Sequence, residues 1–278
     1  MAMRRLNSWN RVSAACVLLG SAVLAVALGA SARAQDSDAE LAKKLSNPVA
    51  SLISVPLQGN YDCCYGPEDG GRYTLNVQPV IPFSLNQDWN LIIRTIVPIV
   101  KQERTTDLQG SAFGLGDTTQ SFFFSPKAVR NGVTWAIGPA ILWPTGESDL
   151  GSKKWGAGPT ALVLKQQNGF TYGMLVNHIW SFADAGDHDR PDVSSTFIQP
   201  FFSHTSKTAT TWGINAETSY NWKTGGWTVP VNLSVSHVYK FGGQRVSIGG
   251  GPRVYLARDG QQGPEWGARL IATFLFPK

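Results

Sequence analysis

The chain has 278 residues with 24 basic and 19 acidic side chains, which gives a net charge of +5. Four of the arginines and none of the acids lie in residues 1–34, so the remaining 244 residues carry a net charge of only +1. This balance, without any basic run, argues against a nucleic-acid partner. Residues 35–278 contain no apolar stretch of 18 residues, which excludes an ordinary transmembrane helix.

Residues 1–34 have the three parts of a secretory signal peptide. Three arginines form a basic region, an uncharged apolar run follows, and Ala32-Arg33-Ala34 is an A-x-A cleavage site. An uncleaved N-terminal anchor is the alternative. We therefore expect export of the rest of the chain.

The exported part has two cysteines, Cys63 and Cys64, which are adjacent. Neighbouring cysteines pair only as a vicinal disulfide or between molecules, and their spacing is not that of a zinc site. We interpret them as an incidental loop feature. No nucleotide-binding motif is present either, so we expect no cofactor.

Residues 35–50 form an N-terminal segment that contains a short predicted helix. Ser37-Asp38-Ala39-Glu40 has the form of a capping box, and Leu41 and Leu45 follow at helical spacing before Pro48. These signals predict a helix at 38–46. In a barrel it would plug the lumen or hang in the periplasm, and a frayed leader is the third possibility.

Residues 51–278 read as one all-β domain, because no long linker or shift of composition divides them. Twelve candidate strands are each close to the length of a tilted transmembrane strand: 51–59, 71–83, 88–101, 113–125, 133–144, 154–165, 170–182, 193–205, 209–222, 227–240, 244–256 and 265–276. The sequence thus predicts an antiparallel transmembrane β-barrel of about 12 strands.

The connections between these strands alternate in length, as expected for short periplasmic turns and longer external loops. Long polar connections are predicted at 60–70, 102–112, 146–153, 183–192 and 257–264, with a shorter one at 223–226. Tight turns are predicted near 86–87, 130–132, 167–169, 206–207 and 242–243.

Alternation within strands indicates which side is apolar. Trp212, Ile214 and Ala216 alternate with Gly213, Asn215 and Glu217 in the ninth strand. One face suits lipid and the other suits water. A soluble sandwich or a lipocalin-like barrel would instead turn the apolar face inward.

Aromatic residues favour the membrane barrel, because they fall at strand ends in two belts. The external belt has Trp143, Trp155, Trp180, Trp222, Trp227 and Trp266, and the periplasmic belt has Trp89, Trp135, Phe170, Tyr172, Tyr239 and Phe276. Several prolines inside the proposed strands count against this assignment, and they require bulges, bends or earlier strand ends.

The last strand, 266–276, ends on Phe274 and Phe276, which resemble the signal recognised by the barrel-assembly machinery. Ile271 and Leu275 interrupt its otherwise small and polar inner row. We therefore expect two kinds of partner, the assembly machinery and the lipid and lipopolysaccharide of the outer membrane.

Six stretches carry a family resemblance: 41–58 (LAKKLSNPVASLISVPLQ), 72–100, 113–127 (FGLGDTTQSFFFSPK), 154–166, 171–183 and 266–278 (WGARLIATFLFPK). They resemble a family of Gram-negative outer-membrane transporters, often mislabelled neuromedin U and related to the MetA-pathway of phenol degradation barrels. The resemblance implies an outer-membrane barrel and solute passage. It implies no catalytic or binding residue.

The polar row supplies the candidate pore-lining residues: Arg72, Arg94, Asp117, Asn215, Glu217, Asn232, Arg253 and Arg269. With Arg245, arginines on this row outnumber acids five to two, which predicts a mild preference for anions. The first hypothesis is a passive channel for small solutes. The alternative is a packed polar interior that conducts nothing, in a structural or surface-interaction barrel.

Two further hypotheses carry less support. A phospholipase-like enzyme would need a serine activated by one of the four histidines, His178, His188, His204 and His237, and none lies in a segment resembling that enzyme's motif. The acidic loop at 184–192 has carboxylates for calcium, but its spacing does not match an EF-hand. We interpret it as a solvated loop, and we expect neither catalysis nor a metal site.

Overall fold

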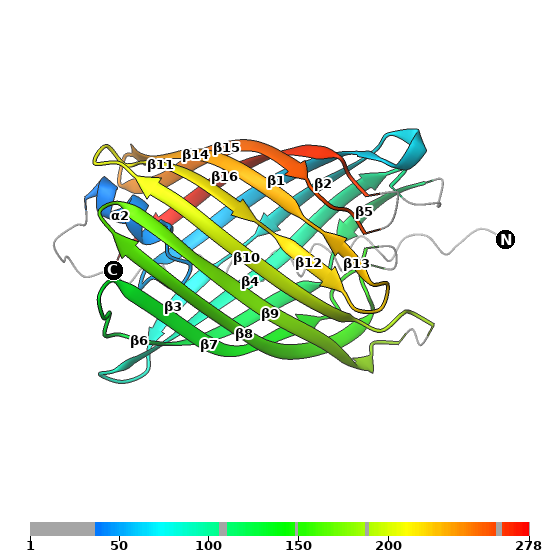
Figure 1. Cartoon of the computed structure of the whole chain (residues 1–278), viewed down its shortest axis with the longest axis horizontal. Coiled ribbons are helices and arrows are strands. Elements are labelled where there is room, and N and C mark those ends of the chain that lie inside the picture. The colour runs from blue at the N-terminus through cyan, green and yellow to red at the C-terminus, as the bar shows by residue number, and fades with distance from the viewer. Residues whose placement is uncertain (1–36, 106–109, 148–149, 187–188, 260–262, 278) are drawn as a thin grey trace. The chain divides into compact units, whose positions relative to one another are not determined.

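The computed structural model describes residues 37–105, 110–147, 150–186, 189–259 and 263–277. The predicted signal peptide lies outside them. The described residues form a closed antiparallel barrel of 12 strands with one short helix (Figure 1). The barrel closes because the first strand pairs with the last, from Ile53 opposite Phe276 to Cys63 opposite Trp266. No described helix is long and apolar enough to cross a membrane.

The strand segments are β1 (Ile53–Tyr65), β2 (Gly70–Val77), β3 (Val80–Ser84), β4 (Trp89–Glu103), β5 (Ser111–Leu115), β6 (Thr118–Pro126), β7 (Val133–Trp143), β8 (Lys154–Gln167), β9 (Phe170–Asp184), β10 (Ser194–Thr205), β11 (Thr210–Ala216), β12 (Thr218–Asn221), β13 (Gly226–Thr228), β14 (Pro230–Phe241), β15 (Gln244–Tyr255) and β16 (Trp266–Phe276). Four pairs of consecutive segments, β2–β3, β5–β6, β11–β12 and β13–β14, each make one interrupted strand of the barrel. Helix α2 (Asp38–Leu45) and the 3-10 helix η2 (Gly66–Glu68) complete the elements.

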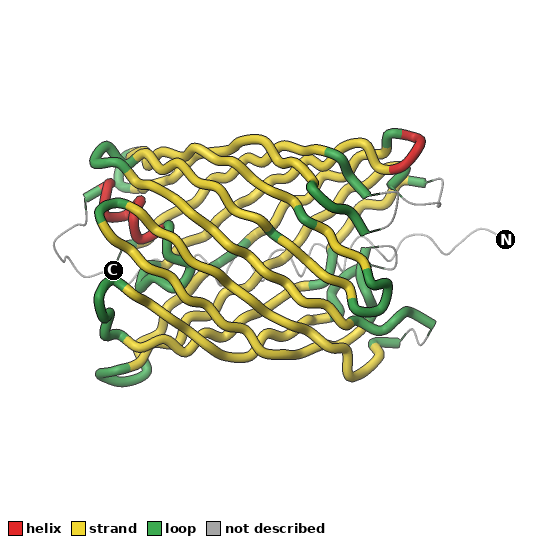
Figure 2. The backbone as a smooth tube through the Cα atoms, in the orientation of Figure 1, coloured by secondary structure: helices red, strands yellow, loops and turns green. Residues whose placement is uncertain are grey.

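The five tight turns occur where the sequence predicts them, all at the end of the barrel that holds α2 (Figure 2). Asn131-Gly132 and Asn168-Gly169 have positive φ at both residues, as a type I′ turn requires. We call this the helix end and the opposite one the loop end. The alternation in connection length is therefore confirmed, apart from the first loop.

The first predicted loop, 60–70, is wrong. β1 continues to Tyr65, and only η2 and Asp69 separate it from β2. Cys63 and Cys64 consequently lie at the end of a strand rather than in a loop, and they are bonded to each other. The predicted loop would place Asn60 and Asp62 in an external connection, but both residues are buried on the inner face of the barrel.

Prolines explain why some strands are interrupted. Pro79 lies in the break between β2 and β3, and Pro230 begins β14 directly after the break that follows β13. Pro98 faces the break between β5 and β6, where its carbonyl accepts from the Gly116 N–H. Because proline lacks an N–H to donate, a continuous ladder is impossible at these points. The expected early strand ends are therefore present at these points. Other prolines lie inside uninterrupted strand segments, among them Pro139, Pro159, Pro200 and Pro252.

The outer surface is apolar, as the alternation predicts. Trp212 is 59% exposed and Leu270 is 74% exposed, whereas Arg269 beside Leu270 is 3% exposed. Aromatic contacts form within each predicted belt. Trp143 packs on Trp155 at the loop end, and Trp89 packs on Trp135 at the helix end. An apolar exterior with aromatic girdles at both ends is the surface of a membrane-spanning barrel.

Candidate functional site

The lumen is narrowed at its helix end by α2 and the residues that follow it. The predicted capping box is present, with the Glu40 N–H donating to Ser37 Oγ and the Ser37 N–H donating to a Glu40 carboxylate oxygen, both at 3.2 Å. The helix packs on barrel residues through one apolar cluster: Leu41, Ala42, Leu52, Ala209, Val238 and Leu275. Of the alternatives for this segment, the plug is therefore the one observed.

Polar contacts fix the orientation of the helix. Arg245 Nε on β15 donates to Asp38 Oδ1 at 2.6 Å, and Gln166 Nε2 donates to the Lys43 carbonyl at 3.0 Å. Leu275, which interrupts the polar inner row of the last strand, is 1% exposed because it supports the helix.

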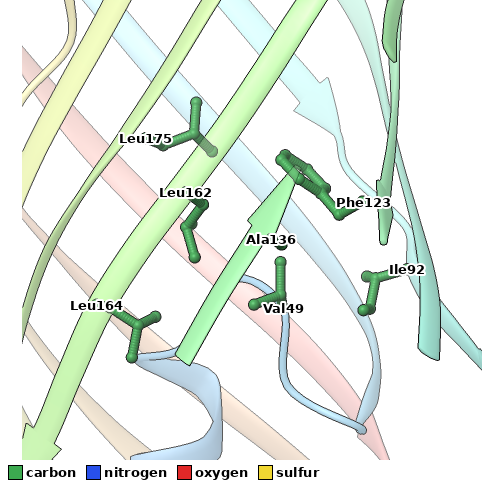
Figure 3. Close-up of a cluster of buried hydrophobic side chains, with 7 residues drawn as sticks. All are labelled: Val49, Ile92, Phe123, Ala136, Leu162, Leu164 and Leu175. Atoms are coloured by element: carbon green, nitrogen blue, oxygen red, sulfur yellow. The ribbon is translucent and has the colours of Figure 1, made fainter. Parts of the chain in front are cut away.

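A second apolar cluster covers the inner wall of β4 and β6–β9. Val49, which follows the helix, enters this cluster from the N-terminal segment (Figure 3). Its other members are Ile92, Phe123, Ala136, Leu162, Leu164 and Leu175, and Phe197 and Phe201 pack against it. One sector of the lumen wall is therefore apolar.

The opposite sector, on β1, β11 and β14–β16, carries a network of charges centred on Glu217. Arg269 donates to both Glu217 carboxylate oxygens, at 2.9 and 2.7 Å, and Arg253 Nη1 donates to one of them at 2.7 Å. Such bidentate arginine–carboxylate pairs are strong and geometrically specific. Glu217 lies at the break between β11 and β12.

A second acid balances this network. Asp62 Oδ1 lies 3.0 Å from Arg253 Nε, although the Nε hydrogen is directed to the Tyr255 hydroxyl at 2.9 Å. Two arginines and two carboxylates make the network neutral. Hydrogen bonds to asparagine side chains extend the network. Asn60 accepts from Arg269, Asn232 accepts from Arg253, and Asn232 in turn donates to Asn215.

Two inner-row arginines, Arg72 and Arg94, have a different environment. Arg72 donates twice to Gln102 Oε1, at 3.1 and 2.6 Å, and Arg94 Nη2 donates to Gln78 Oε1 at 2.9 Å. Within the described ranges, neither arginine forms an ion pair. Of the described arginines that line the two cavities of the lumen, these two are therefore the ones without a carboxylate partner.

Two adjoining cavities lie in the described part of the lumen. The loop-side cavity measures about 620 Å³ and includes Arg72, Glu217, Arg253 and Arg269 in its lining. The helix-side cavity measures about 300 Å³ and is lined in part by residues 44–48. Six described residues line both cavities, and we call them the junction: Gln58, Gln78, Arg94, Gln199, Asn215 and Ile271.

The eight predicted pore-lining residues divide into three groups. Arg72, Arg94, Asn215, Glu217, Arg253 and Arg269 line a cavity, and Asn232 is 1% exposed behind them. Asp117 lies elsewhere, because its carboxylate accepts from the backbone N–H groups of Gly146 and Ser152 and so anchors an external loop. Asp62 was missed, although Gln58, Asn60 and Asp62 continue the polar alternation of β1.

The three described histidines do not form the pairs that an esterase needs. His178 and His237 share hydrogen bonds with the hydroxyls of Thr196 and Thr210, at 2.7 and 2.9 Å, and His204 stacks on Phe170. His188 lies outside the described residues. No described histidine contacts a serine hydroxyl, and among the described residues no group of side chains could hold a metal ion.

Residues 72–278 match the profile of the family described as "Putative MetA-pathway of phenol degradation". The chain belongs to this family. The family match begins in β2 and runs to the last residue, so it includes the junction residues except Gln58. The resemblance to MetA-pathway barrels that the sequence indicated is thereby confirmed. No curated protein matches the chain.

Solved structures resemble this family member in fold. An outer membrane channel from Pseudomonas putida F1 superposes with a TM-score of 0.66 at 12% identity, covering 81% of this chain and 96% of that one. The NanC porin superposes with a TM-score of 0.50 at 8% identity, covering 81% of this chain and 100% of that one. Family and fold are thus those of an outer-membrane β-barrel.

Proposed function

We propose that this barrel is a passive channel for small solutes across the outer membrane. The observation that carries the proposal is the pair of cavities that meet at the junction, one toward each end of the lumen. Amide side chains predominate at the junction, and such groups can exchange hydrogen bonds with water or a passing solute. The plug of residues 37–52 would limit the solute to the space beside it.

The family and the channels and porins of similar fold support this proposal. We further propose that the apolar outer face contacts lipid and lipopolysaccharide, and that the aromatic end of β16 is recognised by the barrel-assembly machinery. The competing hypothesis is a non-conducting structural barrel, which the apolar contact of Val49 with the opposite wall favours.

Single-channel recording in planar bilayers separates the two hypotheses. The folded wild-type protein should give discrete conductance steps. Gln199→Trp places a large ring at the junction and should reduce the conductance, whereas Leu233→Trp on the exposed outer face is the matched control and should not. Silence from folded wild-type protein would favour the non-conducting barrel. Equal currents from both variants would show that ions do not pass the junction.

A further inference from the structure

Arg94 is the charged member of the junction, and most of its hydrogen-bonding capacity is unused. Its guanidinium has five N–H donors, and within the described residues it makes one hydrogen bond, to Gln78 Oε1 at 2.9 Å. The side chain reaches both cavities. It therefore borders space that a solute can enter.

Three acidic side chains line the loop-side cavity with Arg94, and each has another partner. Asp259 accepts from the Thr224 hydroxyl at 2.7 Å. Glu217 lines the same loop-side cavity, but Arg253 and Arg269 occupy both its oxygens. Asp62 Oδ1 lies 3.0 Å from Arg253 Nε, so its charge is compensated by that arginine. A buried or confined charge is costly unless it is paired or hydrated, so Arg94 offers its charge to an anion that enters from outside.

Apolar side chains line the same cavity as this cation. Ile96, Leu175 and Phe197 line the loop-side cavity together with Arg94. Leu175 belongs to the apolar cluster on the inner wall (Figure 3). Phe197 packs against this cluster. The cavity of about 620 Å³ has the size of small-molecule sites. A cationic fork beside an apolar wall matches a ligand with a charged head and an apolar body.

We propose that the junction is a binding site for small organic monocarboxylates. Arg94 receives the carboxylate, Gln78 holds the guanidinium in place, and the apolar body lies against Leu175 and Phe197. The assignment of these anions as transported solutes rests on the proposed channel function. The binding itself is measurable without transport.

Titration calorimetry on the full-length barrel in lipid nanodiscs tests this site with hexanoate as the probe. Hexanoate should bind at least about tenfold more tightly than its neutral isostere hexanamide, since a charge-assisted hydrogen bond is lost with the amide. It should also bind at least about tenfold more tightly than acetate, which lacks the apolar body. Equal affinity for hexanoate and hexanamide would overturn the proposal. Equal affinity for hexanoate and acetate would show that the apolar wall does not contribute to binding.

Variants locate the site. Arg94→Gln should weaken hexanoate binding at least about tenfold. Arg72→Gln is the matched control, because Arg72 also donates to a glutamine and lines only the loop-side cavity. It should change the affinity by less than about threefold. If Arg94→Gln binds hexanoate as tightly as the wild type does, the proposed site is refuted. If that variant does not fold, the comparison of hexanoate with hexanamide on wild-type protein still decides.

Conductance separates this inference from the channel proposal. Hexanoate binding to a barrel that is silent in bilayers would keep the site and refute the channel. Conductance without preferential hexanoate binding would keep the channel and refute the site.

Discussion

Glu217→Gln should destabilise the barrel more than removal of the carboxylate from a solvent-exposed ion pair. In the wild type, the Glu217 side chain is 18% exposed and its partners Arg253 and Arg269 are 11% and 3% exposed. Glutamine keeps one acceptor oxygen but carries no charge, and its N–H group is turned toward a guanidinium. Asp62 is then the one carboxylate left in the network to compensate the two arginines. Removing one partner of a buried ion pair costs about 3–5 kcal/mol. Because Glu217 borders a cavity that admits water, we expect the lower limit, about 3 kcal/mol.

Urea unfolding in lipid vesicles, followed by tryptophan fluorescence, measures this loss. Glu103→Gln is the matched control, since Glu103 pairs with Lys101 at a similar distance of 2.8 Å but both side chains are more than half exposed. It should cost less than about 1 kcal/mol. The double variant Glu217→Gln, Arg269→Gln should lose less than the sum of its single variants, since each partner's loss already breaks the pair. A cost for Glu217→Gln no larger than the control would refute the interpretation of the network as buried and mutually dependent.

The remaining predictions concern the plug and the two faces of the wall. Arg245→Gln removes the ion pair with Asp38, which contributes about 1 kcal/mol. Helix α2 should then undock from the barrel more often, which should give faster trypsin cleavage in the helix and larger conductance. An unchanged cleavage rate would contradict this prediction. Leu270→Lys puts a charge on the lipid face in the middle of β16 and should cost about 2–4 kcal/mol in urea unfolding. Ile271 faces the junction, so Ile271→Lys should cost less stability than Leu270→Lys and should shift the reversal potential further toward anions. Equal losses of stability for the two variants would show that the assignment of inner and outer faces is wrong.

Features set by local pattern could be predicted from the sequence. Alternation along 211–222 and 227–240 determines which side chains face lipid, and Asn-Gly pairs determine tight turns. The aromatic belts follow from the same pattern, because rings at strand ends reach the membrane interface. These signals depend on neighbours along one strand, so they need no knowledge of the rest of the barrel.

The first strand shows how a misleading local signal produces an error. The segment 60–66 contains glycine, asparagine, aspartate and adjacent cysteines, which are typical of a loop. Yet Gln58, Asn60 and Asp62 continue the alternation, and the partner β16 extends the ladder to Cys63. In the count of lumen acids Asp62 takes the place of Asp117, which anchors a loop, and Asp38 of the plug pairs with Arg245. The predicted excess of arginines is real only for Arg72 and Arg94.

The plug could not be predicted from the sequence pattern alone, because it depends on contacts between segments that are distant in the sequence. Leu275 was recognised as an exception on a polar row, and an apolar side chain facing the lumen indicates that something covers it. Which segment does so cannot be read from periodicity, since Leu41 and Leu275 lie at opposite ends of the sequence. The partners of each lumen arginine are likewise a property of closure, which brings Glu217 of one hairpin to Arg269 of another.

The distribution of charge in the lumen has a physical logic. Where the interior is packed, between β1, β11 and β14–β16, each arginine has a carboxylate, because an unpaired charge in a packed wall is too costly. Where the interior is open, Arg94 has an amide and a cavity on either side, which is tolerable because water can solvate its remaining donors. A solute that replaces this water must bring comparable hydrogen-bond acceptors, and a neutral apolar molecule cannot. If the proposed channel function holds, the same arrangement that makes the unpaired arginine tolerable should favour anions at the junction.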